Sequence, residues 1–119
     1  MSYAVDTTRY VNAKGQLHRL DGPAVEHSDG IKEWYQNGQR HRDGGPALEE
    51  PDGTRVWYQF GQLHRLDGPA IEYQIGTRFW FVNNRDITLE VMAWIKQQNI
   101  KLPMSESEQS FFILTFVGK

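Results

Sequence analysis

Apolar and polar residues alternate over short runs in the first two thirds of the chain, and each run ends at a turn signal. Residues 23–26 alternate in character and are followed by Asp29-Gly30, while residues 32–36 are followed by Asn37-Gly38. A period of two is typical of a half-buried β-strand, and Asp-Gly or Asn-Gly between such runs favours a tight turn. The pattern therefore predicts a β-hairpin with a two-residue turn at Asp29-Gly30, followed by a longer polar loop after Gly38.

This hairpin pattern recurs with an offset of 23 residues. The motif His-Arg-x-x-Gly-Pro-Ala occurs at residues 18–24, 41–47 and 64–70, and a degraded half-copy, one residue out of step, precedes the first at residues 9–15. Register-locked copies without insertions are typical of repeat proteins, in which each unit stacks on its neighbours. We predict a mainly β fold, an open antiparallel meander of about seven strands built from tandem hairpin repeats.

Equivalent positions of stacked hairpins are expected to form ladders across the sheet. One predicted ladder on the return strands consists of tryptophans, Trp34, Trp57 and Trp80. The opposite face carries Tyr35, Tyr58 and Phe81. Alternation alone leaves open which of the two ladders is buried.

The repeat pattern stops after Asn84, and the remaining third of the chain has a different character. Thr88 is expected to cap a helix that ends near Asn99, with Leu89, Met92, Ala93 and Lys96 on one stripe. Ser105 and Glu108 form a capping box before the apolar run 111–117, which is compatible with a helix or a strand; we favour a helix that turns extended near its end. We therefore predict one domain, 1–119, with repeats over 9–84 and a helical cap over 85–119 that covers the last hairpin or one sheet face. The apolar excess of residues 89–117 also permits a homodimer.

Composition narrows the range of function classes. The chain has 119 residues, a formal net charge of −2 and a pI near 6.1, whereas a non-specific duplex binder needs a basic surplus. It has no cysteine, which excludes a disulfide framework and a thiolate metal site. No apolar run has the length of a membrane span or resembles a signal peptide. We expect a soluble, cytoplasmic protein without membrane or non-specific duplex partners.

Catalytic signatures are weak. The sequence offers no nucleophile triad and no glycine-rich loop between a strand and a helix, so we predict no enzymatic activity and no cofactor. His18, His41 and His64 are evenly spaced, but equivalent residues of successive hairpins lie two strands apart, at roughly 9–10 Å. Ligands of one zinc ion lie within about 4 Å of one another, so we predict no metal site.

Arginines next to aromatic residues are the candidate binding feature. Arg19, Arg42 and Arg65 are expected to form one ladder, while Arg55 and Arg78 share faces with Trp57 and Trp80. Arginine grips phosphate or carboxylate, and aromatic rings stack on bases. The candidate ligand-binding residues are His18, Arg19, Trp34, Tyr35, His41, Arg42, Arg55, Trp57, Tyr58, His64, Arg65, Arg78 and Trp80.

A structural role for the same arginines is the alternative. Each His-Arg pair is followed within three residues by an aspartate, and every repeat carries a glutamate. Internal Arg–Asp or Arg–Glu pairing would use these arginines to fix the loops, and the sequence leaves both interpretations open. The middle copy departs from the others, with Arg40 where they carry Leu17 and Leu63.

The pattern Trp-Tyr-x-x-Gly-x-x-His-Arg-x-x-Gly-Pro-Ala, at residues 34–47 and 57–70, resembles a diverged MORN-type repeat. The variant is similar to repeats of tailed-phage and large-virus proteins, and the resemblance covers roughly residues 9–84. It implies a hairpin scaffold and a viral accessory protein acting in the host cytoplasm. The first functional hypothesis is sequestration of a small anionic, nucleotide-type ligand in counter-defence. The alternatives are an inhibitor or adaptor that binds a host defence protein, and a structural virion component.

Overall fold

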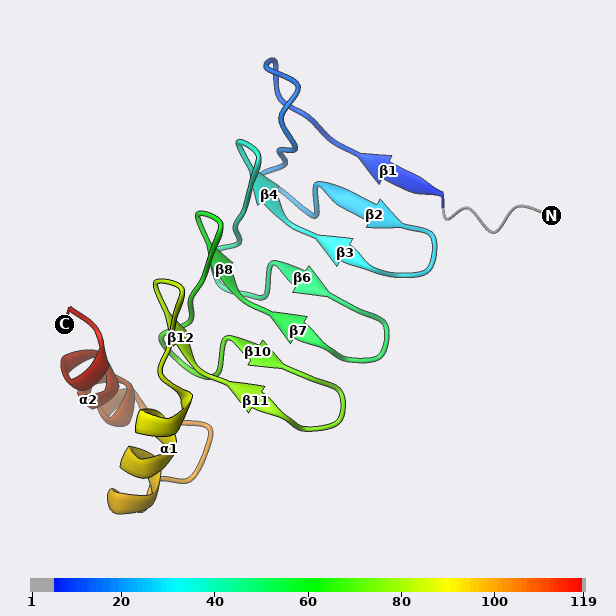
Figure 1. Cartoon of the computed structure of the whole chain (residues 1–119). Coiled ribbons are helices and arrows are strands. Elements are labelled where there is room, and N and C mark those ends of the chain that lie inside the picture. Colours follow the sequence, from blue (N-terminus) through cyan, green and yellow to red (C-terminus); the bar gives the residue numbers. More distant parts are fainter. Residues whose placement is uncertain (1–5, 119) are drawn as a thin grey trace.

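The computed structural model describes residues 6–118 and shows an elongated stack of β-hairpins that ends in two helices (Figure 1). Seven strands form one antiparallel sheet. In their order across the sheet they are β1 (Thr7–Arg9), β2 (Val25–His27), β3 (Lys32–Glu33), β6 (Leu48–Glu49), β7 (Arg55–Val56), β10 (Ile71–Glu72) and β11 (Arg78–Phe79). The predicted mainly β meander with a helical end is confirmed.

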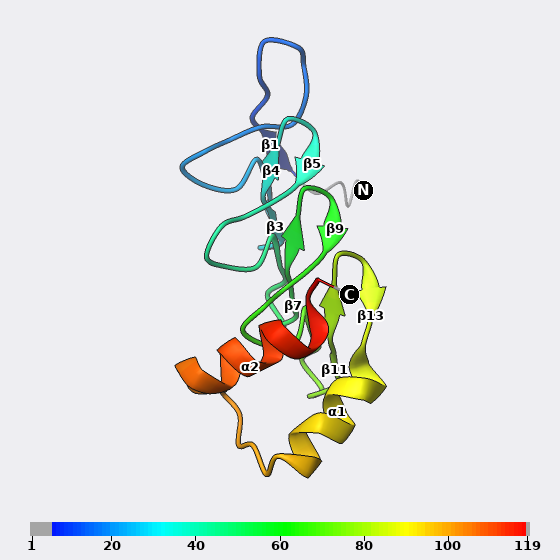
Figure 2. The ribbon, with the colours of Figure 1, turned by 90° about the vertical axis from the view of Figure 1, so that its left-hand side faces the viewer.

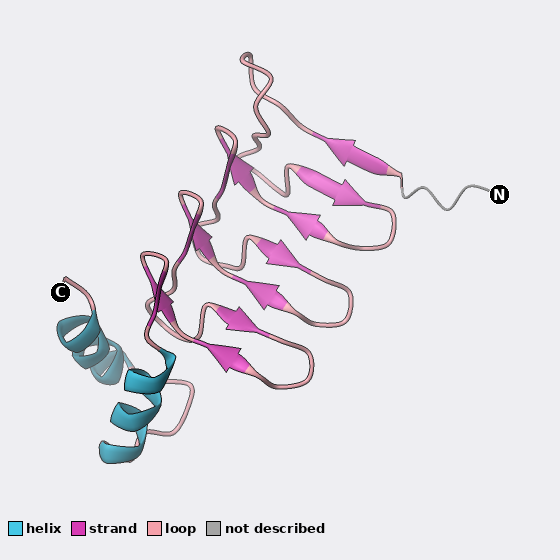
Figure 3. Cartoon of the chain, in the orientation of Figure 1, coloured by secondary structure: helices cyan, strands magenta, loops and turns pink. Residues whose placement is uncertain are grey.

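Each repeat also builds a second, smaller hairpin beside the main sheet (Figure 3). These hairpins are β4 (Tyr35–Gln36) with β5 (Gln39–Arg40), β8 (Tyr58–Gln59) with β9 (Gln62–Leu63), and β12 (Phe81–Val82) with β13 (Arg85–Asp86). The prediction of one hairpin per repeat followed by a long loop was therefore wrong. The return strand is interrupted at Trp34, and Asn37 and Gly38, with φ of 50° and 82°, turn the chain directly into β5. Two consecutive residues with positive φ make the kind of turn whose twist matches a hairpin.

The turn at Asp29-Gly30 is longer than the predicted two residues. The Gly30 N–H donates to the His27 carbonyl at 3.0 Å, and the His27 N–H donates to the Ile31 carbonyl at 3.0 Å. Gly30 has φ of 101°, as expected for a glycine that closes a four-residue turn as a bulge. This requirement explains why the third copy retains Gly76, with φ of 96°, although Ile75 replaces the aspartate.

Successive repeats are joined by equivalent backbone hydrogen bonds. The Trp34 N–H donates to the Ala47 carbonyl and the Trp57 N–H to the Ala70 carbonyl, both at 2.8 Å. Both alanines are completely buried, so the Gly-Pro-Ala element lies where only a small side chain is accommodated. The loops of the three copies point the same way, which is the condition for continuous ladders (Figure 1).

Two helices close the C-terminal end of the stack, α1 (Thr88–Gln97) and α2 (Glu106–Phe116) (Figure 2). The capping box of Ser105 and Glu108 is present, and Val117 is extended just after α2, as predicted. The predicted cap of α1 was wrong, because Ile87 holds that position and the Asp86 carboxylate accepts the Thr88 N–H at 3.0 Å. The hairpin pattern extends through β13, so the helical part begins at Thr88 rather than at residue 85.

The largest buried cluster lies between the last repeat and the helices. Its members are Trp80, Val82, Ile87, Val91, Met104 and Phe112. The stripe predicted for α1 does not face this core, since Leu89 and Met92 are 79% and 57% exposed. The helix instead turns Val91 inward, because Trp80 and Val82 offer the apolar surface on that side.

Candidate functional site

The guanidinium group of each His-Arg pair lies over an aromatic ring of the preceding unit. The Arg42 guanidinium carbon is 4.0 Å from the Trp34 ring centroid, and that of Arg65 is 3.8 Å from the Trp57 centroid. Arg19 lies 4.1 Å from the Tyr10 ring of the half-copy. Cation–π stacking therefore joins each unit to the next.

The same guanidinium groups are hydrogen-bonded within their own loops. Arg19, Arg42 and Arg65 donate to the carbonyls of Pro23, Pro46 and Pro69 at 3.1, 3.0 and 3.0 Å. Carboxylates complete the pairing, with Asp21 at 3.1 Å from Arg19, Glu49 at 3.2 Å from Arg42 and Asp67 at 2.7 Å from Arg65. The internal-pairing interpretation therefore describes the geometry of all three arginines.

The glycine of Gly-Pro-Ala makes room for these guanidinium groups. A Cβ atom on Gly45 would lie 3.0 Å from the Arg42 guanidinium carbon, and one on Gly68 would lie 2.7 Å from that of Arg65. Such contacts are closer than van der Waals packing allows, so any larger residue would displace the arginine. The His-Arg-x-x-Gly-Pro-Ala motif is thus an architectural unit.

The histidines that precede these arginines bind the next hairpin turn. Nδ1 of His18, His41 and His64 accepts the backbone N–H of Asn37, Phe60 and Asn83 respectively, at 3.0 Å in each case. An imidazole can accept there only when Nδ1 is unprotonated, and burial lowers the pKa of His64, which favours that state. Within residues 6–118, no group of histidine, aspartate and glutamate side chains is arranged to hold a metal ion.

The departure of the middle copy at Arg40 is explained by an internal ion pair. Arg40 donates to the Glu33 carboxylate at 2.7 Å and to the Tyr35 hydroxyl at 3.1 Å. Burial pushes the pKa of Glu33 upward, but hydrogen bonds from His27 and Arg40 outweigh it, and the pKa lies below its usual value. One repeat later both charged positions are apolar, Val56 and Leu63, so the sequence did contain a signal of this pairing.

Neither aromatic ladder is uniformly buried. Trp80 is only 3% exposed, whereas Trp34, Trp57, Tyr35 and Tyr58 are half-buried. The burial of Trp80 follows from its place beside the helices rather than from strand alternation. The candidate stacking surface therefore does not run along the full stack.

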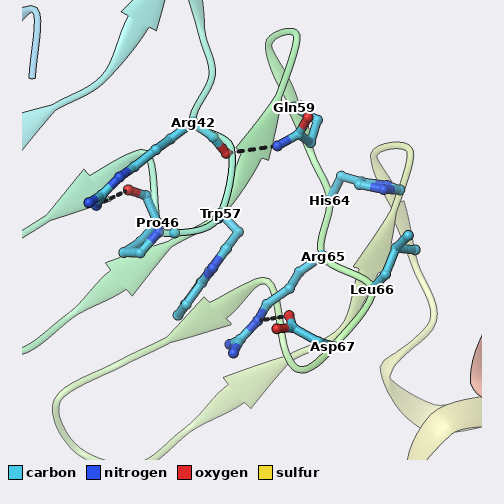
Figure 4. Close-up of a pocket in the computed structure, with 10 residues that line it drawn as sticks. Arg42, Pro46, Trp57, Gln59, His64, Arg65, Leu66 and Asp67 are labelled. Atoms are coloured by element: carbon cyan, nitrogen blue, oxygen red, sulfur yellow. Dashed lines mark hydrogen bonds and ion pairs between the residues drawn. The ribbon is translucent and has the colours of Figure 1, made fainter. Parts of the chain in front are cut away.

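Open grooves lie between successive His-Arg loops (Figure 4). The larger, of about 420 Å³, includes Arg42, Trp57, His64 and Asp67 in its lining, and an equivalent one of about 360 Å³ lies one repeat earlier. Its arginines are already engaged, Gln59 donates to the Arg42 carbonyl at 2.8 Å, and Asp67 adds negative charge. These contacts leave little free positive charge for an anion.

Arg55 and Arg78 lie on the main sheet, away from the aromatic stacks. Arg55 is exposed and lies between Glu49 and Glu72 on the neighbouring strands. Arg78 donates to the Gly76 carbonyl at 3.0 Å and lies 4.0 Å from Glu72. Arg78 is nevertheless linked to the ladder of arginines, because the Glu72 carboxylate lies 3.4 Å from Arg65 as well, and Arg65 and Arg78 line one groove of about 410 Å³.

The end of the stack has a different surface. A groove of about 570 Å³ runs along β11 and is lined by Phe79, Trp80, Met92, Ile95 and Leu102, together with Gly76, Thr77, Arg78 and Thr88. Most of its lining is apolar, and within the described part of the chain β11 pairs with β10 alone. The sequence did not predict this groove, because the helical cap was expected to cover the last hairpin or one sheet face. The helices cover Trp80 and Val82 but leave the β11 edge open.

No protein-family model matches this chain, and no curated protein or solved structure is significantly similar to it. In the described residues, neither helix has the length and apolar character needed to cross a membrane.

Proposed function

We propose that the protein is a non-enzymatic binding protein that recognises a protein partner in the groove between β11 and α1. The observation that carries the proposal is a mostly apolar groove that follows a strand edge with no partner within residues 6–118. Exposed apolar surface and open strand edges are the features through which proteins recognise other proteins.

The polar side chains of the repeats are bonded within the chain, which also favours the groove as the binding surface. The arginines and histidines of the repeats bind groups within the chain, so they act as connectors between units. Over residues 6–87 six large apolar side chains are exposed, and another six lie on the shorter segment 88–118. The latter are Leu89, Met92, Leu102, Phe111, Ile113 and Leu114.

Two substitutions of exposed apolar residues test the proposal. Met92→Glu places a charge in the groove, whereas Leu20→Glu places the same charge on a His-Arg loop, where Leu20 is 76% exposed. We expect capture of a protein partner from lysate of the source cells to be lost with Met92→Glu and retained with Leu20→Glu. Circular dichroism should show that both variants remain folded.

Three outcomes would overturn the proposal. Capture that survives Met92→Glu would place the partner elsewhere. Calorimetric uptake of a nucleotide that Arg42→Ala abolishes would favour the anionic-ligand hypothesis. Self-association that Met92→Glu disrupts, seen by analytical ultracentrifugation, would identify a second copy as the occupant.

A further inference from the structure

We propose that the open edge of β11 binds an extended partner segment as an added antiparallel strand, and that this segment carries an aliphatic residue followed by an acidic residue. The inference rests on the proposed function and specifies the partner's chemistry. In this mode of recognition the main chain supplies hydrogen bonds, and alternate side chains supply specificity.

The edge is open because the stack ends in the middle of its repeating pattern. The return strands β3 and β7 are each paired on both edges, whereas within residues 6–118 β11 is paired on one. The backbone hydrogen bond that would join Trp80 to a following repeat is also replaced. The Trp80 N–H donates to the Thr88 hydroxyl at 2.9 Å, whereas Trp34 and Trp57 donate to alanine carbonyls. Helix α1 thus closes the stack at Trp80, and within the described residues Arg78 and Phe79 have β10 on one side and no strand on the other.

A ladder of alternating charge crosses the sheet and ends at this edge. In order it consists of Glu26, Lys32, Glu49, Arg55, Glu72 and Arg78. Every basic residue before the last lies between two glutamates, one on each neighbouring strand. Arg78 lies opposite Glu72 on one side only, and its side chain is 52% exposed. Because opposite charges directly across strands are favourable, an added strand should place a carboxylate opposite Arg78.

The neighbouring register position favours an apolar residue. Phe79 is aligned with Ile71, which is aligned with Val56 on the strand before it. Met92, Ile95 and Leu102 line the groove beside Phe79, so an added side chain there would be surrounded by apolar groups. The first strand of each repeat supplies this pair in the same order: Val25-Glu26, Leu48-Glu49 and Ile71-Glu72. The partner segment therefore resembles the first strand of a further repeat.

Within the described residues, β1 of a second copy does not offer this pair at the register of its own sheet edge. β1 presents Thr8 at the charge register, opposite Glu26, and Arg9 at the apolar register, opposite Val25. Arg9 would place a cation where the groove is apolar, and Thr8 supplies no carboxylate for Arg78. This mismatch disfavours end-to-end polymerisation of copies and favours a segment of another protein.

The probe is a synthetic peptide with the sequence of residues 68–74, acetylated and amidated, which carries the Ile71-Glu72 pair. We expect an NMR titration of the full chain to shift the backbone amides of Arg78 and Phe79 and the methyl group of Met92. A peptide with lysine in place of the glutamate should bind roughly three- to tenfold more weakly, the range for reversing a cross-strand charge pair.

A charge swap makes the test specific for the register. Arg78→Glu should reverse the preference, so that the lysine peptide binds more tightly than the glutamate peptide. Lys32→Glu, the same reversal at the equivalent interior position, should leave both affinities unchanged, because both edges of β3 are already paired.

Shifts confined to other parts of the molecule, equal affinity for both peptides, or no reversal in Arg78→Glu would each overturn strand addition. Such a failure, combined with loss of partner capture in Met92→Glu, would leave the proposed function intact and eliminate only this mode of binding. Retained capture in Met92→Glu would instead contradict the proposed function itself.

Discussion

The tryptophan at the same position of each repeat is packed in one way within the repeats and in another way at the helical end. Trp34 and Trp57 each carry a guanidinium group on the ring, from Arg42 and Arg65. The Trp80 ring instead meets Phe112 of α2, with ring centroids 5.5 Å apart. The repeat uses charged and polar contacts between its units, and the helical end replaces them with an apolar core.

The 23-residue register shows how that replacement is made. Ile87 stands at the register position of His64, and Thr88 stands at that of Arg65. The backbone bond is retained, since the Ile87 N–H donates to the Trp80 carbonyl at 2.9 Å as the His64 N–H donates to the Trp57 carbonyl at 3.2 Å. The stack is therefore ended by keeping this backbone hydrogen bond of the repeat and replacing another, since the Trp80 N–H donates to the Thr88 hydroxyl.

The largest expected effect concerns the apolar core at the helical end, where Phe112 replaces the arginine of the repeats. Phe112 is completely buried and lies within 5.5 Å of Trp80 and 5.1 Å of Phe116, measured between ring centroids. Phe112→Ala should lower the free energy of unfolding by about 3–5 kcal/mol, because it removes a ring from a packed site and leaves a cavity. Urea unfolding followed by tryptophan fluorescence measures this change.

Leu114→Ala is the matched control on the same helix. Leu114 is 76% exposed, so its loss should change the free energy of unfolding by less than about 0.5 kcal/mol. Equal effects of the two substitutions would show that α2 does not pack on the repeat through Phe112.

The second prediction concerns the arginine contacts that join one repeat to the next. Arg65→Ala removes the stack on Trp57 and the bonds to Pro69 and Asp67, and should cost about 1–3 kcal/mol of stability. Arg65→Lys should recover only part of this loss, because an ammonium group lacks the planar shape that covers the ring. Unchanged stability in Arg65→Ala would mean that the arginine is not a connector and would return it to the candidate ligand site.

Some of these contacts could be predicted from the sequence and others could not. An aspartate within three residues of each His-Arg pair indicated internal pairing, and the 23-residue register indicated stacked, equivalent loops. The stacking of Arg42 on Trp34 could not be predicted. Strand alternation does not reveal that the strand is interrupted at Trp34 and that a second hairpin starts there. The open β11 edge was missed for a related reason. Met92 and Ile95 of α1 line the groove along this edge, and the apolar stripe of a helix does not say where the helix lies relative to the last hairpin.

The third prediction uses the histidine position, which the helical end replaces with Ile87. Burial lowers the pKa of His64 in the folded chain, so the unfolded chain takes up a proton first as pH falls. The stabilising contribution is therefore fully present above the ordinary pKa of about 6.5 and is lost as pH falls toward the lower folded value. Urea midpoints measured from about pH 7.5 to about pH 5.5 should fall, before most carboxylates titrate.

His64→Asn is the control for this pH effect. An asparagine carbonyl can occupy the place of Nδ1 and accept the Asn83 N–H without titrating. The variant should therefore show a smaller drop in midpoint over the same pH range. A drop equal to that of the parent chain would assign the pH dependence to other groups.

The smallest expected effect concerns Phe60, which interrupts the uniformity of the repeats. The equivalent turn positions hold Asn37 and Asn83, and all three residues have φ of 49° to 50°. A left-handed conformation costs a bulky residue about 1 kcal/mol more than it costs asparagine. The tilted contact between the exposed Phe60 ring and His41, at 4.2 Å between ring centroids, stabilises the fold by only about 0.5 kcal/mol. Phe60→Asn should therefore raise the free energy of unfolding by less than about 1 kcal/mol, because the N–H of residue 60 still donates to His41.

Phe60→Ala is the control, since it loses the ring without gaining a residue suited to the turn, and its stability should lie below that of Phe60→Asn. If Phe60→Asn proves less stable than the parent chain, the contact with His41 outweighs the backbone strain, and the phenylalanine serves the stack rather than disturbing it.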